Sequence, residues 1–127
     1  DLTGIILKPN MILAGNKSKN KISNEEVSSK TIDCLKTSVP SEVPGVAFLS
    51  GGQSEIEATE NLNLINKNNN TNFIMTYSYG RALQQSALKT WSKDTQNVKE
   101  TQITFNHRAK MCSLAAQGKW SISLENK

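Results

Sequence analysis

The chain has 127 residues, of which 36% are hydrophobic, so it can supply the core of one domain or of part of one domain. None of its apolar runs approaches the roughly 18 residues of a membrane span, so we expect a soluble protein without a membrane partner. The net charge of +4 comes from dispersed lysines, which argues against the clustered basic surface of a nucleic-acid-binding module.

The chain has two cysteines and one histidine. Cys34 and Cys112 fall inside predicted helices without a CxxC spacing, which favours buried or half-buried free thiols over a disulfide. His107 stands without a cluster of further metal-ligating residues, so we expect no metal and no other cofactor. Free thiols indicate a reducing compartment, which is the cytoplasm or a plastid.

The first predicted strand covers residues 4–8, where a short apolar segment ends in a lysine followed by a proline. Proline has no N–H to donate to a sheet ladder, so the strand must end at about Lys8. The sequence therefore places Lys8 at the tip of a strand.

A helix is predicted over residues 24–38, because Ser23 and Glu26 form a capping box. Its inner face has helical spacing, and two prolines break the pattern before the next strand. This face consists of Val27, Thr31, Cys34 and Leu35.

A buried strand over 46–49 leads into the turn Ser50-Gly51-Gly52 and then into a helix start, where Ser54 and Glu57 form a second capping box. A strand, a glycine turn and a helix N-terminus place backbone N–H groups around a concavity, and the helix dipole favours an anion there. Phosphate is the natural ligand. Taken alone, a Gly-Gly turn between a strand and a helix is more often an ordinary structural feature, because glycine is the default residue for positive φ.

The next predicted helix covers residues 55–66 and ends in an asparagine-rich stretch, 66–72, that we expect to form an exposed loop. A third strand over 73–77 follows. It ends in Ser-Tyr-Gly-Arg at 78–81 and leads into a helix over 82–91.

The last predicted helix begins at a cap formed by Asp94 or Thr95 and is closed by Gly118. We expect residues 120–127 to form a poorly ordered tail. The predicted inner face of this helix consists of Val98, Gln102, Phe105, Ala109, Cys112 and Ala116.

The alternation of strands and helices predicts an α/β fold with a parallel sheet and right-handed crossovers. Three strands leave two open edges, so the chain is expected to be part of a larger barrel or of a doubly wound sheet. In either architecture the chemistry lies at the carboxyl ends of the strands.

Two side chains at the predicted strand ends have a chemistry of their own. A desolvated lysine such as Lys8 can attack a ketone and form a Schiff base. Arg81 offers a planar, permanently charged group suited to a phosphate. Without further context, each residue also has a non-functional interpretation. Lys8 can be a snorkelling or salt-bridged lysine, and Arg81 can be an ordinary surface arginine.

Several segments resemble the class I fructose-bisphosphate aldolases. They are Leu-Lys-Pro-Asn-Met at 7–11, Val-Pro-Gly at 43–45, Phe-Leu-Ser-Gly-Gly-Gln-Ser-Glu at 48–55, Asn-Leu-Asn at 61–63 and Tyr-Ser-Tyr-Gly-Arg-Ala-Leu-Gln at 77–84. They occur in the family's order, and the resemblance extends from Thr3 to about Lys119. The three long motifs, at 7–11, 48–55 and 77–84, are together far more specific than any one of them.

The resemblance implies a TIM (β/α)8 barrel, of which residues 1–127 would be the carboxyl-terminal part with its sixth, seventh and eighth strands. It implies reversible cleavage of fructose 1,6-bisphosphate into dihydroxyacetone phosphate and glyceraldehyde 3-phosphate, with Lys8 as the Schiff-base lysine. The full-length protein would be a homo-oligomer, a tetramer. The binding site for the C1 phosphate would consist of Ser50, Gly51, Gly52, Ser78, Gly80 and Arg81.

The family's aspartate, glutamate and further lysines lie on earlier strands, ahead of Asp1. We therefore expect the chain to be active only within a complete barrel, since proton transfers during carbon–carbon cleavage need a positioned carboxyl group. The alternative is an inactive aldolase-derived fragment that binds anions or proteins. A third reading is a different Schiff-base lyase with another substrate.

Overall fold

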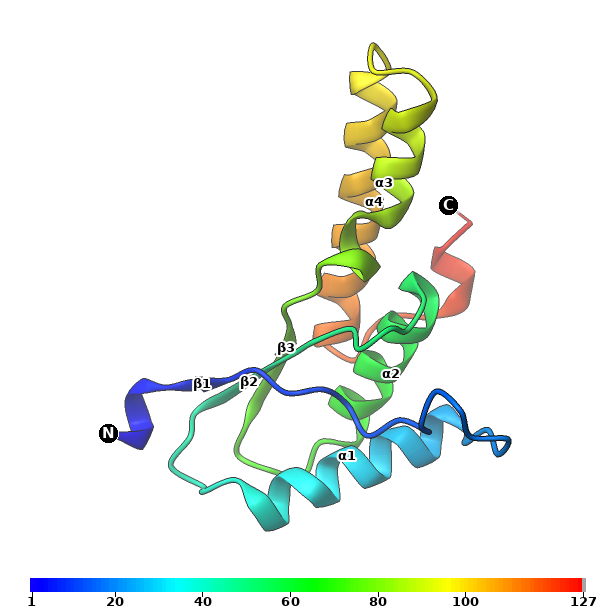
Figure 1. Cartoon of the computed structure of the whole chain (residues 1–127). Helices are drawn as coiled ribbons and strands as arrows, with labels where there is room; N and C mark the ends of the chain where they lie inside the picture. Colours follow the sequence, from blue (N-terminus) through cyan, green and yellow to red (C-terminus); the bar gives the residue numbers. More distant parts are fainter. Residues whose placement is uncertain (127) are drawn as a thin grey trace.

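A computed structural model describes residues 1–126 and shows a parallel α/β fold (Figure 1). The sheet has three strands in the order β1-β2-β3, and both strand pairs are parallel, which confirms the predicted class. The elements are η1 (Leu2–Gly4), β1 (Ile6–Leu7), α1 (Asn24–Ser38), β2 (Gly45–Phe48), α2 (Glu55–Asn68), β3 (Ile74–Tyr77), α3 (Arg81–Lys93), α4 (Val98–Ala116) and η2 (Ile122–Leu124).

Two helices begin where their capping residues predict. Ser54 accepts a hydrogen bond from the backbone N–H of Glu57, whose carboxylate in turn accepts from the backbone N–H of Ser54, so the capping box of α2 is complete. At α1, Ser23 accepts from the backbone N–H of Glu26. Only the first half of the predicted box is therefore present at α1.

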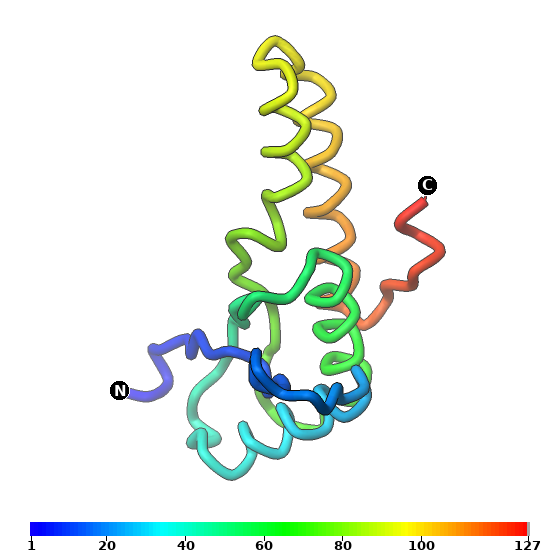
Figure 2. The backbone as a smooth tube through the Cα atoms, turned by 45° about the vertical axis from the view of Figure 1, so that its right-hand side comes forward, coloured from blue at the N-terminus to red at the C-terminus, as the bar shows by residue number. Residues whose placement is uncertain are grey.

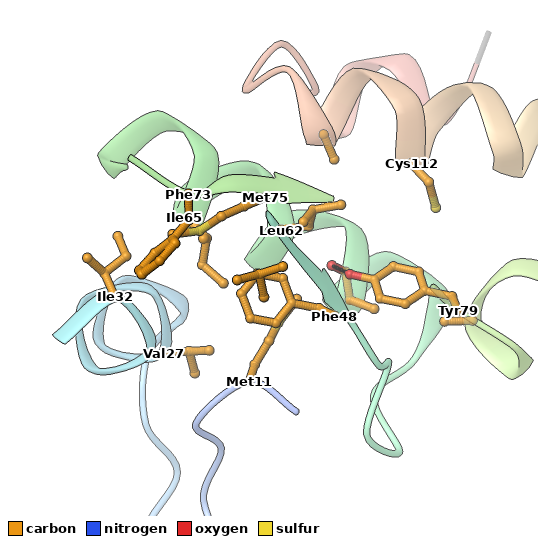
Figure 3. Packing of buried hydrophobic residues seen from close by; sticks show 14 of the residues in the cluster. Met11, Val27, Ile32, Phe48, Leu62, Ile65, Phe73, Met75, Tyr79 and Cys112 are labelled. Carbon is orange, nitrogen blue, oxygen red and sulfur yellow. Dashed lines mark hydrogen bonds between the residues drawn. The ribbon is translucent and has the colours of Figure 1, made fainter. Parts of the chain in front are cut away.

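One face of the sheet is covered and carries the core (Figure 3). Phe48 and Met75 point to this face and pack with the buried face of α2, including Leu62 and Ile65. Val46 is paired with Met75 and is buried in the same cluster. The opposite face is open, because Ile6 and Ile74 keep 63% and 75% of their surface exposed. These two isoleucines lie in one row across the strands, since each is paired with Gly45.

Helices α3 and α4 form an antiparallel hairpin that extends away from the sheet (Figures 1 and 2). The N-cap of α4 is Asn97 and not the predicted Asp94 or Thr95. The predicted inner face of α4 is confirmed in its second half, where Cys112 is buried and Ala116 packs against the core. It is wrong at its start, which projects beyond the core and leaves Val98 53% exposed. The residues buried on α4 are Arg108, Met111, Cys112 and Ala115.

The asparagine-rich stretch, predicted to be an exposed loop, contains a hydrogen-bonded turn. Helix α2 continues to Asn68, and the side chain of Asn69 then accepts hydrogen bonds from the backbone N–H of Thr71 (2.9 Å) and from its hydroxyl (2.7 Å). The same amide donates to the carbonyl of Phe73 (3.0 Å). Asn69 therefore builds the turn that leads into β3.

The described part of the predicted tail, residues 120–126, packs against the protein. Trp120 is only 4% exposed, and its backbone N–H donates to Asn63 Oδ1 at 3.0 Å. A short 3-10 helix, Ile122–Leu124, follows. Lys127 lies outside the described residues.

The two cysteines differ in exposure. Cys112 is buried beside the hydroxyl of Thr59, and burial raises the pKa of its thiol, as predicted for a buried free cysteine. Cys34 is exposed, which corrects the prediction that it is buried or half-buried on the inner face of α1. Within residues 1–126, no group of three or more potential metal ligands occurs and no helix is long and apolar enough to cross a membrane.

We expect Asn69→Ala to lower the free energy of unfolding by about 1–2 kcal/mol, because three hydrogen bonds of the turn before β3 are lost together. Urea denaturation of the whole chain measures this. Asn70→Ala is the matched control, since Asn70 is exposed and should change the stability by less than about 0.5 kcal/mol. Equal effects of the two substitutions would contradict the role of Asn69.

Candidate functional site

The predicted site residues follow three adjacent parallel strands and therefore lie at one edge of the sheet. The ladder continues past the strands, since Leu49 N donates to the carbonyl of Pro9 (2.9 Å) and Ser78 N donates to the carbonyl of Phe48 (2.8 Å). These bonds bring together the loops that follow β1, β2 and β3. Parallel pairing thus aligns the carboxyl ends of the strands, where ligands of such sheets bind.

Lys8 directly follows β1, and strand alternation places it on the open face together with Ile6. Its side chain is exposed. Within residues 1–126 its ammonium group has no hydrogen bond and no ion pair. The described residues therefore position Lys8 at the sheet edge but do not desolvate it.

The glycine turn after β2 needs its glycines. Gly51 and Gly52 have φ angles of +58° and +87°, in the left-handed region that other residues adopt at a cost. A Cβ on Gly51 would lie 3.2 Å from Asn10 Oδ1, so the loop after β1 packs closely against this turn. The preceding Ser50 is buried, and its carbonyl accepts from both the backbone N–H and the side-chain amide of Gln53.

The start of α2 is less open to an anion than its sequence suggests. The carboxylate of Glu57 already occupies this helix end through the capping box with Ser54. The backbone N–H groups of Gly51 and Gly52, in contrast, have no hydrogen-bond partner among residues 1–126. The donors available to a ligand on this side are therefore those of the glycine turn.

The start of α3 has the opposite character. Its N-cap is Gly80, which forms no side-chain cap, and its first turn contains no acidic residue. Arg81 is the first residue of this helix, and its side chain is exposed. An uncapped helix N-terminus beside a guanidinium group favours a bound anion.

Two contacts that the sequence analysis missed hold α2 against α3 and the loop before it. The buried phenol of Tyr79 donates to the carbonyl of Ala58 (2.9 Å), and burial raises its pKa, which keeps this donor protonated. The carboxylate of Glu55 accepts from the backbone N–H of Ser86 (2.9 Å) and from its hydroxyl. No spacing in the sequence signals these pairs, because each joins residues that are at least 21 positions apart.

A cavity of about 290 Å³ opens beside the glycine turn. Gly51 and Gly52 line it together with Lys21 and Glu57. A larger groove of about 590 Å³ lies between α3 and α4 and contains none of the predicted site residues. The predicted site residues thus lie at the strand ends and outside this larger groove.

The sequence matches the family model described as Glycolytic, fructose-bisphosphate aldolase class-I, over residues 1–127. It is 50% identical to fructose-bisphosphate aldolase 2, chloroplastic, of Pisum sativum over 117 residues, which are 92% of this chain and 33% of the relative. It is 48% identical to fructose-bisphosphate aldolase A of Salmo salar over 123 residues, which are 96% of this chain and 34% of the relative.

A solved structure of fructose-bisphosphate aldolase from Plasmodium falciparum, in complex with TRAP and a small-molecule inhibitor, superposes with a TM-score of 0.90. It is 45% identical, and the match covers 94% of this chain and 35% of that chain. The chain therefore has the fold of part of an aldolase barrel, as predicted, and spans about a third of the length of its relatives. It belongs to the class I fructose-bisphosphate aldolase family.

Proposed function

We propose that residues 1–127 form the carboxyl-terminal part of a class I fructose-bisphosphate aldolase and supply its Schiff-base lysine and its C1-phosphate site. The observation that carries the proposal is the placement of Lys8, the glycine turn and Arg81 after three adjacent parallel strands. In such barrels the loops after the last strands commonly bind a phosphate group.

In the proposed reaction, the amine of Lys8 attacks the C2 ketone of fructose 1,6-bisphosphate, and loss of water leaves an iminium ion. A base removes the proton of the C4 hydroxyl, the C3–C4 bond breaks, and its electron pair moves into the iminium to form an enamine. Glyceraldehyde 3-phosphate is released. Protonation of the enamine at C3 and hydrolysis of the resulting iminium then release dihydroxyacetone phosphate and free Lys8.

In the proposed phosphate site, the guanidinium group of Arg81 and the N–H groups of Gly51 and Gly52 approach the C1 phosphate from two neighbouring loops. Ser50, Ser78 and Gly80 complete the site. The guanidinium group of Arg81 opposes the negative charge of the ligand. The carboxylates of Glu55 and Glu57 do not compete for this group, because they accept hydrogen bonds from Ser86 and Ser54. The Tyr79 and Glu55 contacts hold the two loops at a fixed separation.

The proposed activity depends on residues beyond the described ones. Lys8 becomes an efficient nucleophile when its neutral form is favoured, which needs a low-dielectric or cationic environment. The open sheet face around Ile6 and Ile74 is where further strands of a barrel would provide it. Such strands would also supply the carboxyl groups for proton transfer.

The same proposal includes the substrate class, the oligomeric state and the compartment. The substrate is a phosphorylated sugar, the assembled enzyme is a homotetramer acting in glycolysis, and the compartment is the cytoplasm or a plastid. The reaction needs no metal ion, because the iminium is the electron sink.

The first test places this chain in a complete barrel, as a chimera in which it replaces the matching part of the Pisum sativum relative. After incubation with dihydroxyacetone phosphate and reduction with borohydride, mass spectrometry should locate the adduct on Lys8. Lys8→Arg should abolish the adduct and lower the rate of fructose 1,6-bisphosphate cleavage by on the order of 10³-fold or more, because the nucleophile is lost.

Lys36→Arg is the matched control, since Lys36 is an exposed lysine in the last turn of α1 and should leave both readouts unchanged. An adduct on another lysine would refute the assignment of Lys8. A folded chimera that forms no adduct would favour the inactive binding module instead.

The second test concerns the phosphate site in the same chimera. Arg81→Ala should raise KM for fructose 1,6-bisphosphate about 10–100-fold, as expected for the loss of a charge-assisted hydrogen bond, with a smaller effect on kcat. Lys89→Ala, which removes an exposed cation from the same helix, should change KM less than about twofold. An unchanged KM for Arg81→Ala would show that the phosphate binds elsewhere.

A further inference from the structure

A buried arginine on α4 meets a carboxylate from the carboxyl-terminal segment. The side chain of Arg108 is only 4% exposed, and one of its terminal nitrogens, Nη2, lies 2.5 Å from Glu125 Oε1. The carboxylate of Glu125 is itself 10% exposed. A guanidinium group cannot be buried to this extent without a countercharge, and Glu125 supplies it.

Two further donors converge on the same carboxylate. The indole N–H of Trp120 donates to Glu125 Oε1 at 2.7 Å, and His107 Nε2 lies 3.4 Å from Oε2. The donors come from α4 and from the start of the segment itself. Their arrangement around two oxygen atoms is that of a site for a carboxylate.

The site is only partly filled by Glu125. Arg108 Nε is buried and has no hydrogen-bond partner among residues 1–126, so Glu125 uses one arm of the guanidinium fork. Arg108 and His107 also line a cavity of about 330 Å³. A buried donor without a partner is costly, which favours a ligand that can reach it.

Another carboxylate, that of Glu55, lines the same cavity. It is a weaker candidate as the countercharge of Arg108, because its two oxygens accept from the N–H and the hydroxyl of Ser86. Glu125 is therefore the carboxylate that pairs with Arg108. The site lies at the contact that joins α2 to α3.

We propose that Arg108 and His107 form a carboxylate-binding site on α4, which Glu125 occupies as an intramolecular ligand and thereby holds residues 120–126 on the body of the protein. A small free carboxylate can take the place of Glu125 when that side chain is removed. This inference does not depend on the proposed aldolase activity, since it concerns α4 and the final segment alone.

The test uses the complete chain with Trp91→Phe, so that the emission of Trp120 is observed alone. In this background Glu125→Gln should shift the emission to the red and raise the acrylamide quenching constant of Trp120 at least twofold. Hydrogen exchange of residues 117–126 should accelerate by on the order of 100-fold, as expected when a buried ion pair loses one partner. Glu100→Gln, the same substitution at an exposed position of α4, should change none of these readouts.

Chemical rescue distinguishes a carboxylate site from general packing. In Glu125→Ala, sodium formate should restore the blue-shifted emission in a saturable manner, whereas sodium chloride at equal ionic strength should not. Arg108→Gln combined with Glu125→Ala should abolish the rescue.

Two results would overturn the proposal. The first is an unchanged Trp120 environment in Glu125→Gln, which would mean that packing of the indole alone holds the segment. The second is equal recovery with formate and chloride, which would show a nonspecific salt effect.

Discussion

Parallel pairing of three short strands is the constraint on which the rest of this structure depends. It places the loops after β1, β2 and β3 at one edge, and the ladder continues beyond the strands through the Leu49–Pro9 and Ser78–Phe48 bonds. Residues more than 70 positions apart, such as Lys8 and Arg81, thereby share one edge of the sheet. The core covers one face of this sheet, and Lys8 lies on the open face.

The two helices that start at this edge differ in how the free N–H groups of their first turns are paired. The N-terminus of α2 is satisfied by its own acidic side chain, Glu57, whereas α3 begins at Gly80 without any side-chain cap. An uncapped helix start keeps its partial positive charge available for a ligand. The different starts explain why the guanidinium of Arg81 and the N–H groups of the glycine turn, rather than the start of α2, are the groups left for an anion.

Buried and partly buried polar groups hold the outer helices in place. The Glu55–Ser86 contact joins α2 to α3, and Arg108 joins α4 to the final segment through Glu125. A buried charge or carboxylate that is paired fixes the relative position of two elements more sharply than apolar contact does, because an alternative packing would leave it unpaired. The Glu55–Ser86 contact thereby fixes the position of α3, which begins with Arg81, relative to α2.

The sequence by itself determined the α/β alternation, the helix α1, the complete capping box at Ser54 and the family, because these rest on local signals and on motifs that are continuous in the chain. Only the tertiary structure decided that α4 is buried in its second half alone, that Asn69 builds a turn and that residues 120–126 pack on the protein. Each of these depends on which distant surface an element meets. The exposure of Lys8 could not be predicted from the sequence either, since burial of a strand end depends on the elements that cover the sheet.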